Sequence, residues 1–590
     1  MSRLLLGITS SHDASACVFV DGELRAAISE ERLTRVKGDG GRLPELAIDR
    51  CLAMVGATRL DVDAIAMTYN HVPEEYCRRT SARKEAERRL SRALKKLLGR
   101  ANRTQYFLSE ILRHLREDPQ RRFEDYFFAD RFLAGEGFRA GIPLRFVDHH
   151  RTHAVAAGYF SGFSRAAVVT MDGEGDLDIH HTSSVLEDGR LRCLHVSDTP
   201  GNSPGYFYMS ITELLGFRPL RHEGKVLGLA AFGQPSALLE PFCRAMRLSA
   251  DGHGFASDFA GLERALDRRH EFLAKVVRGQ ARETVAAAAQ QVFEEVIVAL
   301  VLNFLRESGQ RRLALNGGVF ANVKLNQRLA ALPEVESLFV FPAMSDAGNC
   351  VGAALSVLDA MNPGALSRAH EALETVFLGP EFSAEEIRAE LEKSGLRHAY
   401  QEGPALADRA AQAIHAGDVV GWFQGRMEFG PRALGNRSML ARATDATINK
   451  SLNDRLDRTE FMPFAPSVLA EHAEGIFENL HKSRHTAEFM TITYDVSPAW
   501  RGRVPAVVHV DGTARPQLVR RDRNPRCWEV IERYRQLSGI PLVLNTSFNV
   551  HEEPIVCAPR EAVQALVDDR IDCLAIGPFW VESPRRRAAP

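Results

Sequence analysis

Two stretches of the sequence, residues 4–29 and 166–196, follow the same plan. In each, an apolar strand runs into a polar turn that carries an aspartate, and two more strands follow, joined by an Asp-Gly hairpin turn. Asp-Gly turns are common, so two unrelated hairpins would give a similar pattern. The shared order of all the parts favours an internal duplication. The predicted strands are 4–8, 16–20 and 24–29 in the first copy and 167–171, 182–186 and 191–195 in the second.

This plan resembles the duplicated ribonuclease-H-like core of the actin and sugar-kinase ATPases. In that fold the two polar turns face each other across a cleft that holds phosphates. We therefore expect an α/β protein whose N-terminal half is built from two related sheets.

The chain of 590 residues is long enough for more than one hydrophobic core. Asn362-Pro363-Gly364 breaks the regular pattern, and we place a first domain at 1–362 and a second at 372–590. The formal net charge of −2 implies no bulk attraction to nucleic acid or to an anionic membrane. The nine cysteines form no CxxC pair and indicate reduced thiols. With no signal peptide or membrane span evident, we expect a cytoplasmic protein.

A polar cluster, residues 148–153, follows a predicted buried strand at 142–147 and precedes a helix at 154–160. His149 and His153 stand four residues apart, so one helical face can aim both imidazoles at one point. This spacing suits a divalent metal, although two surface histidines near a helix start would look the same.

Asp346 is our candidate for the carboxylate that completes this metal site. It follows the predicted strand 338–341, and α/β sheets bind ligands at the carboxyl ends of their strands. The alternative role is a helix N-cap. Asp172, in the second polar turn, is a further candidate ligand. Imidazoles with carboxylates suit a first-row ion; we expect Fe²⁺, with Mn²⁺ or Zn²⁺ as alternatives.

Glycines mark a candidate nucleotide site. Gly317 and Gly318 lie between the strand 313–315 and a helix opened by Asn322, where free N–H groups leave room for a phosphate. Strand-to-helix turns often use glycine without any ligand. Glycines around Glu223 and Lys225 would also let a ligand approach the backbone.

The second half contains an arginine- and glycine-rich loop at 425–438. The arginine fork suits bidentate contact with phosphate, so this loop predicts an oxyanion cradle. Further polar groups follow apolar strands and indicate a second anion- and nucleotide-binding site. Its candidate residues are Arg426, Arg432, Arg458, Arg515, Asn545 and Ser547.

Taken together, these segments resemble the O-carbamoyltransferases of the nodulation, cephamycin and tobramycin type along almost the whole chain. The matching motifs in the first half are HDASA at 12–16, EERLTR at 30–35, HHRTH at 149–153, DGEGD at 172–176, EGKVLGLA at 223–230, NGGVFAN at 316–322 and SDAGN at 345–349. Those in the second half are GRMEFGPRALGNRS at 425–438, FMPFAPS at 461–467, DGTAR at 511–515 and NTSFNVHEEP at 545–554.

The resemblance implies an N-terminal domain like the tRNA threonylcarbamoyl-transferase and a C-terminal domain of the YrdC kind. It also implies two reactions. The C-terminal domain makes carbamoyl-adenylate from carbamoyl phosphate and ATP, with Mg²⁺ accompanying the nucleotide. The N-terminal domain then moves the carbamoyl group to a hydroxyl of a small molecule, of the antibiotic type.

The resemblance also assigns residues. His12 is the expected general base, a task that suits imidazole near neutral pH, with Asp13 beside it. Lys37 matches a lysine that touches the adenylate. The expected metal ligands are His149, His153, Asp172 and Asp346. The expected nucleotide contacts are Glu174, Glu223, Lys225, Asn316, Gly317, Gly318 and Asn322.

The chain departs from the family pattern in two places. Tobramycin-type members carry a Lys-x-Arg-Glu-x-Phe-Arg-Pro-Phe segment, in which Leu456 and Met462 replace the lysine and the second arginine here. Arg455 or Arg458 could compensate. The sequence HEEP at 551–554 replaces the more usual HGEP.

Two other functions are also compatible with the sequence. A threonylcarbamoyl-transfer protein acting on tRNA would share the N-terminal motifs, but the near-neutral charge and the absence of a long basic face weigh against it. A non-enzymatic ATP- and metal-binding partner would need no base. The acceptor stays open among aminoglycoside, ansa-macrolactam, β-lactam and lipo-oligosaccharide, and we expect a monomer or homodimer.

Overall fold

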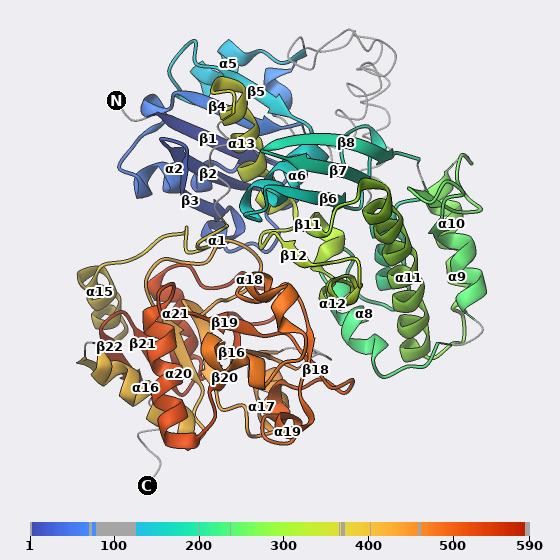
Figure 1. Cartoon of the computed structure of the whole chain (residues 1–590). Helices are drawn as coiled ribbons and strands as arrows, with labels where there is room; N and C mark the ends of the chain where they lie inside the picture. The colour runs from blue at the N-terminus through green and yellow to red at the C-terminus, as the bar shows by residue number, and fades with distance from the viewer. Residues whose placement is uncertain are drawn as a thin grey trace, which may run out of the picture.

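Figure 1 shows the computed structural model of the chain, with the N-terminal half above and the C-terminal half below. Arg458 and Met462 fall outside the described residues, so the predictions that concern them have no structural counterpart. The structure describes residues 3–69, 73–77, 126–199, 201–235, 238–262, 264–364, 366, 372–401, 403–457, 461 and 463–583.

The first sheet has five strands in the order β3-β2-β1-β4-β5. β1 has a nearly continuous apolar sequence and is buried at every position, as expected for a central strand. β1 pairs antiparallel with β2 and parallel with β4, and β5 is parallel to β4. The strands are β1 (Leu4–Thr9), β2 (Ser15–Val20), β3 (Glu23–Ser29), β4 (Ala64–Thr68) and β5 (Leu144–Val147).

The second sheet repeats this arrangement, with the order β12-β11-β6-β7-β8. Its central strand β6 pairs antiparallel with β7 and parallel with β11, in the same way as β1 with β2 and β4. The predicted duplication is therefore present in the sheet topology. The strands are β6 (Arg165–Met171), β7 (His181–Glu187), β8 (Arg190–Ser197), β11 (Arg312–Asn316) and β12 (Ser337–Val340).

Two helices pack between the sheets. α13 (Asn349–Met361) lies against β1 and β4, and α6 (His149–Phe160) lies against β6 and β11. The two helices also contact each other, which joins the half-domains through their centre (Figure 1). Small residues allow this close approach, since a Cβ on Gly352 would lie 1.9 Å from the carbonyl oxygen of Thr152.

The long helix α11 (Arg282–Ser308) packs on the outer side of the second half-domain, against α7 (Pro204–Leu214), α8 (Glu223–Ala230) and α9 (Leu239–Ala245). In the described part of the chain it is the one helix long and apolar enough to cross a membrane. Its most apolar window is 72% buried, as in a core helix. The sequence predicts this helix at 281–306, within two residues of its observed ends.

The C-terminal half is built on one mixed sheet in the order β13-β22-β21-β14-β15-β20-β16-β19, flanked by the helix pairs α16/α20 and α15/α21. The sequence predicts a capping box at Ser383 and Glu386, and these residues bond reciprocally at the start of α15. The strands are β13 (His398–Tyr400), β14 (Val420–Phe423), β15 (Arg437–Ala441), β16 (Ala465–Leu469), β19 (Gln517–Val519), β20 (Leu542–Ser547), β21 (Cys573–Ile576) and β22 (Phe579–Glu582). The helices are α15 (Ala384–Ser394), α16 (Pro404–Ala416), α20 (Pro525–Ser538) and α21 (Pro559–Val567).

The two halves meet along α12 (Val323–Ala331), which connects β11 to β12 of the second sheet. Lys324 Nζ lies 2.9 Å from Asp511 Oδ2, and Thr493 donates its backbone N–H to the carbonyl of Val323 at 3.3 Å. The apolar core of the second half-domain continues into the C-terminal half without a break. The division at 362 and 372 therefore stays a prediction.

The contact between α6 and α13 gives a first testable prediction. We expect Gly352→Ala to destabilise the protein by about 1–3 kcal/mol, because overpacking forces the two helices apart. A lower melting temperature in differential scanning fluorimetry would show it.

Gly502→Ala is the matched control. Nothing lies within 4 Å of a Cβ at that position, and we expect a change of less than about 0.5 kcal/mol. Equal melting temperatures for the two variants would contradict the close packing of the helices.

Candidate active site

Helix α6 begins at His149, five residues earlier than the sequence predicts. Asp148 makes this early start possible, since its side chain accepts the N–H of Arg151 at 2.8 Å and so caps the helix. As a result His149 and His153 share one face of one helix, and both residues are fully buried.

Two carboxylates face these imidazoles. Asp172 follows β6, and Asp346 opens the short helix η6 (Asp346–Gly348) after β12. Asp172 Oδ2 lies 3.6 Å from His149 Nε2 and 3.3 Å from His153 Nε2. Asp346 Oδ1 lies 3.6 Å from His149 Nε2 and 3.8 Å from His153 Nε2. The structure thus brings together the four residues that the sequence singles out as metal ligands.

The chemistry of this four-residue group fits a divalent cation. One ligand atom from each residue lies within 4.8 Å of all the others, and two imidazoles with two carboxylates suit a first-row ion. Burial disfavours a charged ring, yet Asp346 and Asp172 raise the pKa of His149 to about 10. The carboxylates therefore stabilise positive charge at this point, which a bound cation would supply.

Neighbouring groups hold the ligands in place. Asp176 accepts the backbone N–H of His149 at 2.8 Å, and Asn349 accepts the hydroxyl of Thr152 at 2.8 Å. His150 points the other way, with its Nδ1 2.7 Å from Thr170 Oγ1. Outer contacts of this kind fix the orientation of metal-binding side chains.

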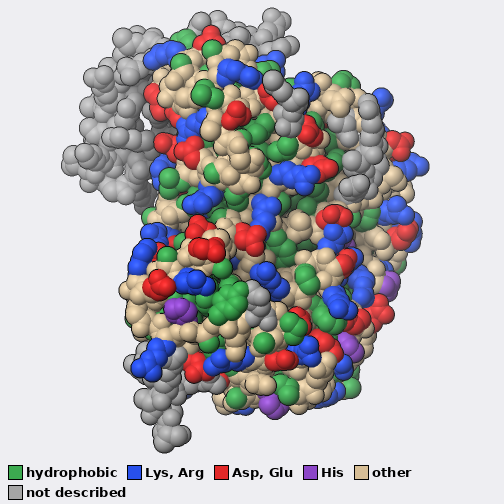
Figure 2. Space-filling model, turned by 90° about the vertical axis from the view of Figure 1, so that its left-hand side faces the viewer, with side chains coloured by type: hydrophobic (Ala, Val, Ile, Leu, Met, Phe, Trp, Pro, Cys, Tyr) green, Lys and Arg blue, Asp and Glu red, His purple; other side chains and the backbone are tan. Residues whose placement is uncertain are grey.

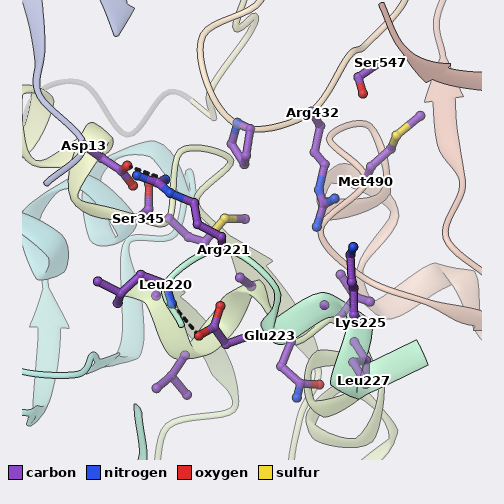
Figure 3. Close-up of a pocket in the computed structure, with 18 of the residues that line it drawn as sticks. Asp13, Leu220, Arg221, Glu223, Lys225, Leu227, Ser345, Arg432, Met490 and Ser547 are labelled. Atoms are coloured by element: carbon purple, nitrogen blue, oxygen red, sulfur yellow. Dashed lines mark hydrogen bonds and ion pairs between the residues drawn. The ribbon is translucent and has the colours of Figure 1, made fainter. Parts of the chain in front are cut away.

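The turn between β1 and β2 places His12 beside the carboxylates. Its Nδ1 lies 3.4 Å from Asp346 Oδ2, and its Nε2 lies 3.7 Å from Asp13 Oδ2. Burial lowers the pKa of His12, but Asp13, Asp346 and Asp172 outweigh this effect and raise it overall. Arg221 pairs with Asp13 at 3.3 Å, as the dashed line in Figure 3 shows.

One cavity of about 540 Å³ connects this group with the C-terminal half. In Figure 3, Lys225 and Arg432 point toward each other across it from the two halves of the chain. The predicted residues that line it from the N-terminal half are His12, Asp13, Lys37, Asp172, Glu223, Lys225, Gly318, Asn322 and Asp346. Those from the C-terminal half are Arg432, Arg515, Asn545 and Ser547.

Three of the predicted nucleotide-binding residues lie outside the cavity lining. Asn316 is fully buried and donates to the carbonyl of His153 at 2.9 Å, so it holds α6 against β11. Gly317 has φ +108°, and a Cβ there would lie 2.1 Å from Met171 O. Glu174 accepts the hydroxyl of Tyr206, a lining residue, at 2.5 Å. Their contact with a nucleotide stays a prediction.

The arginines of the 425–438 loop have different roles. Arg432 faces the cavity, whereas Arg426 donates to the carbonyls of Gly379, Arg25 and Leu378 and ties the loop to β3. Burial lowers the pKa of Arg437 to about 10. Its guanidinium donates to four backbone carbonyls and lies 3.7 Å above the ring of Phe423.

The sequence did not lead us to predict several residues that lie near the site. Arg221 lies in the loop before α8, where nothing in the sequence marks it. Tyr206 lies in the first turn of α7, directly after Gly205, and a glycine is a signal of close backbone approach. Asp176 and Asn349 are the last residues of the motifs DGEGD and SDAGN. Their place in these motifs could have indicated supporting roles.

Comparison with known proteins gives two family matches. The model described as carbamoyltransferase N-terminus matches residues 4–355, and the one described as carbamoyltransferase C-terminus matches residues 411–583. The nodulation protein NolNO of Sinorhizobium fredii (strain NBRC 101917 / NGR234) is 34% identical, over 99% of this chain and 80% of its own length. An uncharacterized Methanocaldococcus jannaschii protein, MJ1058, is 32% identical over 98% of this chain and 99% of its own.

Among solved structures, T.kodakarensis HypF matches 63% of this chain and 49% of its own length. The sequence identity is 11% and the TM-score is 0.34.

If the four-residue group binds a metal, the metal content of the protein should depend on the two histidines of α6. We expect His153→Ala to lose most of the bound divalent metal, because a fully buried ligand is removed and water replaces it poorly. The metal-to-protein ratio, measured by inductively coupled plasma mass spectrometry, would report this loss.

His195→Ala serves as the control. His195 belongs to another group of potential ligands, with His253 and Glu307, which is less buried and lies away from the cavity lining. If His195→Ala lost the metal and His153→Ala kept it, the assignment to the four-residue group would be wrong.

Proposed function

The chain belongs to the carbamoyltransferase family, and from this premise we propose that it is an ATP-dependent O-carbamoyltransferase that works in two steps. The first step forms carbamoyl-adenylate in the C-terminal half. The second step transfers the carbamoyl group to a hydroxyl of a small molecule in the N-terminal half.

The arginines on the C-terminal wall of the cavity support the first step. Arg432 and Arg515 offer guanidinium groups suited to phosphates, and Asn545 and Ser547 add polar contacts. One water cleaves carbamoyl phosphate to carbamate and inorganic phosphate. A carbamate oxygen then bonds to the α-phosphorus of ATP, and pyrophosphate leaves. Carbamoyl phosphate, ATP and water thus give carbamoyl-adenylate, phosphate and pyrophosphate.

The position of His12 supports the second step. Neutral His12 removes the proton of the acceptor hydroxyl as its oxygen bonds to the carbamoyl carbon, and AMP leaves. Asp13 and Asp346 stabilise the imidazolium that forms, which fits their effect on the pKa of His12. A divalent cation held by His149, His153, Asp172 and Asp346 would supply electrostatic stabilisation of negative charge on the carbamoyl or phosphate oxygens.

The single observation that carries this proposal is the shared cavity. Candidate groups for both steps line one space of about 540 Å³, of the size that a nucleotide-like ligand needs. Carbamoyl-adenylate hydrolyses easily, and passage within this space would protect it from water.

We extend the proposal to the two domains, the metal, the oligomeric state and the location of the protein. The repeated sheets suit a ribonuclease-H-like, threonylcarbamoyl-transferase-like domain at 1–362, and the mixed sheet suits a YrdC-like domain at 372–590. Fe²⁺ is the proposed metal, with Mn²⁺ and Zn²⁺ as alternatives. We also propose a cytoplasmic monomer or homodimer that acts in the biosynthesis of an antibiotic-type product.

A small-molecule acceptor is preferred over tRNA. The formal net charge is −2, and the face in Figure 2 shows Lys and Arg interspersed with Asp and Glu and no basic stripe. Incubation of the protein, ATP and carbamoyl phosphate with a panel of hydroxylated metabolites and with tRNA would decide. A mass gain of one carbamoyl group on a metabolite supports the proposal, and modification of tRNA alone contradicts it.

The first step predicts pyrophosphate release that depends on Arg515. We expect the wild-type protein to release pyrophosphate from ATP only when carbamoyl phosphate is present. Arg515→Ala should slow this release about a hundredfold or more, because a charged contact to the transferring phosphate is lost. An exposed arginine away from the cavity gives the control, and Arg503→Ala should leave the rate unchanged.

The second step predicts that His12→Asn separates the two reactions. Loss of the general base should slow carbamoyl transfer to the identified acceptor about 10²–10⁴-fold, while first-turnover pyrophosphate formation stays at the wild-type rate. Equal loss of both activities would contradict the role of His12 in transfer alone.

A further inference from the structure

Glu552 has a backbone conformation that few side chains adopt. Its φ is +61°, in the left-handed region that favours glycine. It lies in the loop between β20 and α21, at the position where the resembling enzymes usually carry a glycine. A side chain with a Cβ persists in this conformation only where its surroundings hold it there.

The side chain of Glu552 crosses from the C-terminal half to the N-terminal half. Its Oε1 lies 2.8 Å from His222 Nε2, and its Oε2 accepts from Arg218 Nη1 at 3.1 Å. The ring of His551 stacks on that of His222, with centroids 5.8 Å apart and planes at 23°. Arg218 and His222 both lie in the loop between α7 and α8.

These three residues, His222, His551 and Glu552, could also be read as ligands of a cation, since their ligand atoms lie within 4.8 Å of one another. The hydrogen bonding of His222 argues against this. Its Nδ1 accepts the backbone N–H of Arg218 at 3.1 Å, so the ring proton resides on Nε2 and is donated to Glu552. A metal on Nε2 would force that proton onto Nδ1, against the N–H of Arg218.

The contacts run from the protein surface to the wall of the cavity. The side chain of Arg218 is 63% exposed, that of Glu552 is 36% exposed and that of His222 is 16% exposed. Glu552 and His551 line the cavity, as do Leu220 and Glu223 on either side of His222. Figure 3 shows Leu220, Arg221 and Glu223 at the cavity.

We propose that Glu552 is a positioning residue that closes the cavity wall between the two halves and so retains carbamoyl-adenylate. This inference rests on the proposed function. An intermediate that escapes is hydrolysed: water bonds to the carbamoyl carbon, the bond to the adenylate oxygen breaks, and carbamate and AMP result. In this role Glu552 acts by joining the loop at 549–554 to the loop before α8.

Acceptor-free turnover tests this role, because it needs no knowledge of the acceptor. The full-length protein is given ATP, Mg²⁺ and carbamoyl phosphate, and AMP and pyrophosphate are measured separately. We expect Glu552→Gly to raise the steady-state release of AMP several-fold over wild type, while first-turnover pyrophosphate formation keeps the wild-type rate. Glycine suits the positive φ, so the variant should fold normally.

Two further variants sharpen the test. Arg218→Ala removes the outermost contact and should raise AMP release by a smaller factor. Glu553→Ala removes the neighbouring exposed carboxylate, which contacts neither His222 nor Arg218 in the described part of the chain, and should behave as wild type.

The outcomes separate this inference from the proposal beneath it. If wild type and Glu552→Gly both form pyrophosphate and release AMP at equal rates, Glu552 does not retain the intermediate. If Glu552→Gly slows first-turnover pyrophosphate formation, the residue acts in adenylate synthesis and the inference is wrong. If the wild-type protein forms no pyrophosphate from ATP and carbamoyl phosphate, the proposed function itself fails.

Discussion

Two carboxylates and two imidazoles share one buried point, and the rest of the structure is arranged to hold them there. Asp172 and Asp346 follow β6 and β12, the strands on either side of β11 in the second sheet, and His149 and His153 come from a helix that follows the first sheet. Buried carboxylates repel each other and need positive charge nearby. This need explains the raised pKa of His149 and why a divalent cation suits the site.

The duplication supplies the geometry. Because the two sheets share one topology, the turn after β1 and the turn after β6 face the same cleft, one with His12 and the other with Asp172. The C-terminal half then covers the cleft, fixed by the Lys324–Asp511 ion pair along α12 and by Glu552 at the opposite loop. Arg432 and Arg515 on one side and His12 on the other line the same cavity.

The local sequence pattern was enough to predict the strands of both copies, the capped helix α15 and the convergence of the four candidate ligands. Each of these features rests on hydrophobic periodicity or on the residues at the ends of strands. The local pattern did not predict features that depend on contacts between residues far apart in the sequence or on the cap of a helix. The start of α6 depends on the cap by Asp148, and Asn316 and Arg426 turn away from the cavity to bond distant carbonyls. The contacts of Arg221 and Glu552 join segments far apart in the sequence.

The central claim is that a metal resides between α6 and the two aspartates. The most direct test is anomalous X-ray diffraction from crystals of the metal-loaded protein, collected at the absorption edge of the bound element. We predict one strong peak about 2.0–2.3 Å from His149 Nε2 and His153 Nε2 and from at least one oxygen of Asp172 or Asp346. A strong peak at His195 and His253 instead, with none at α6, would contradict the account.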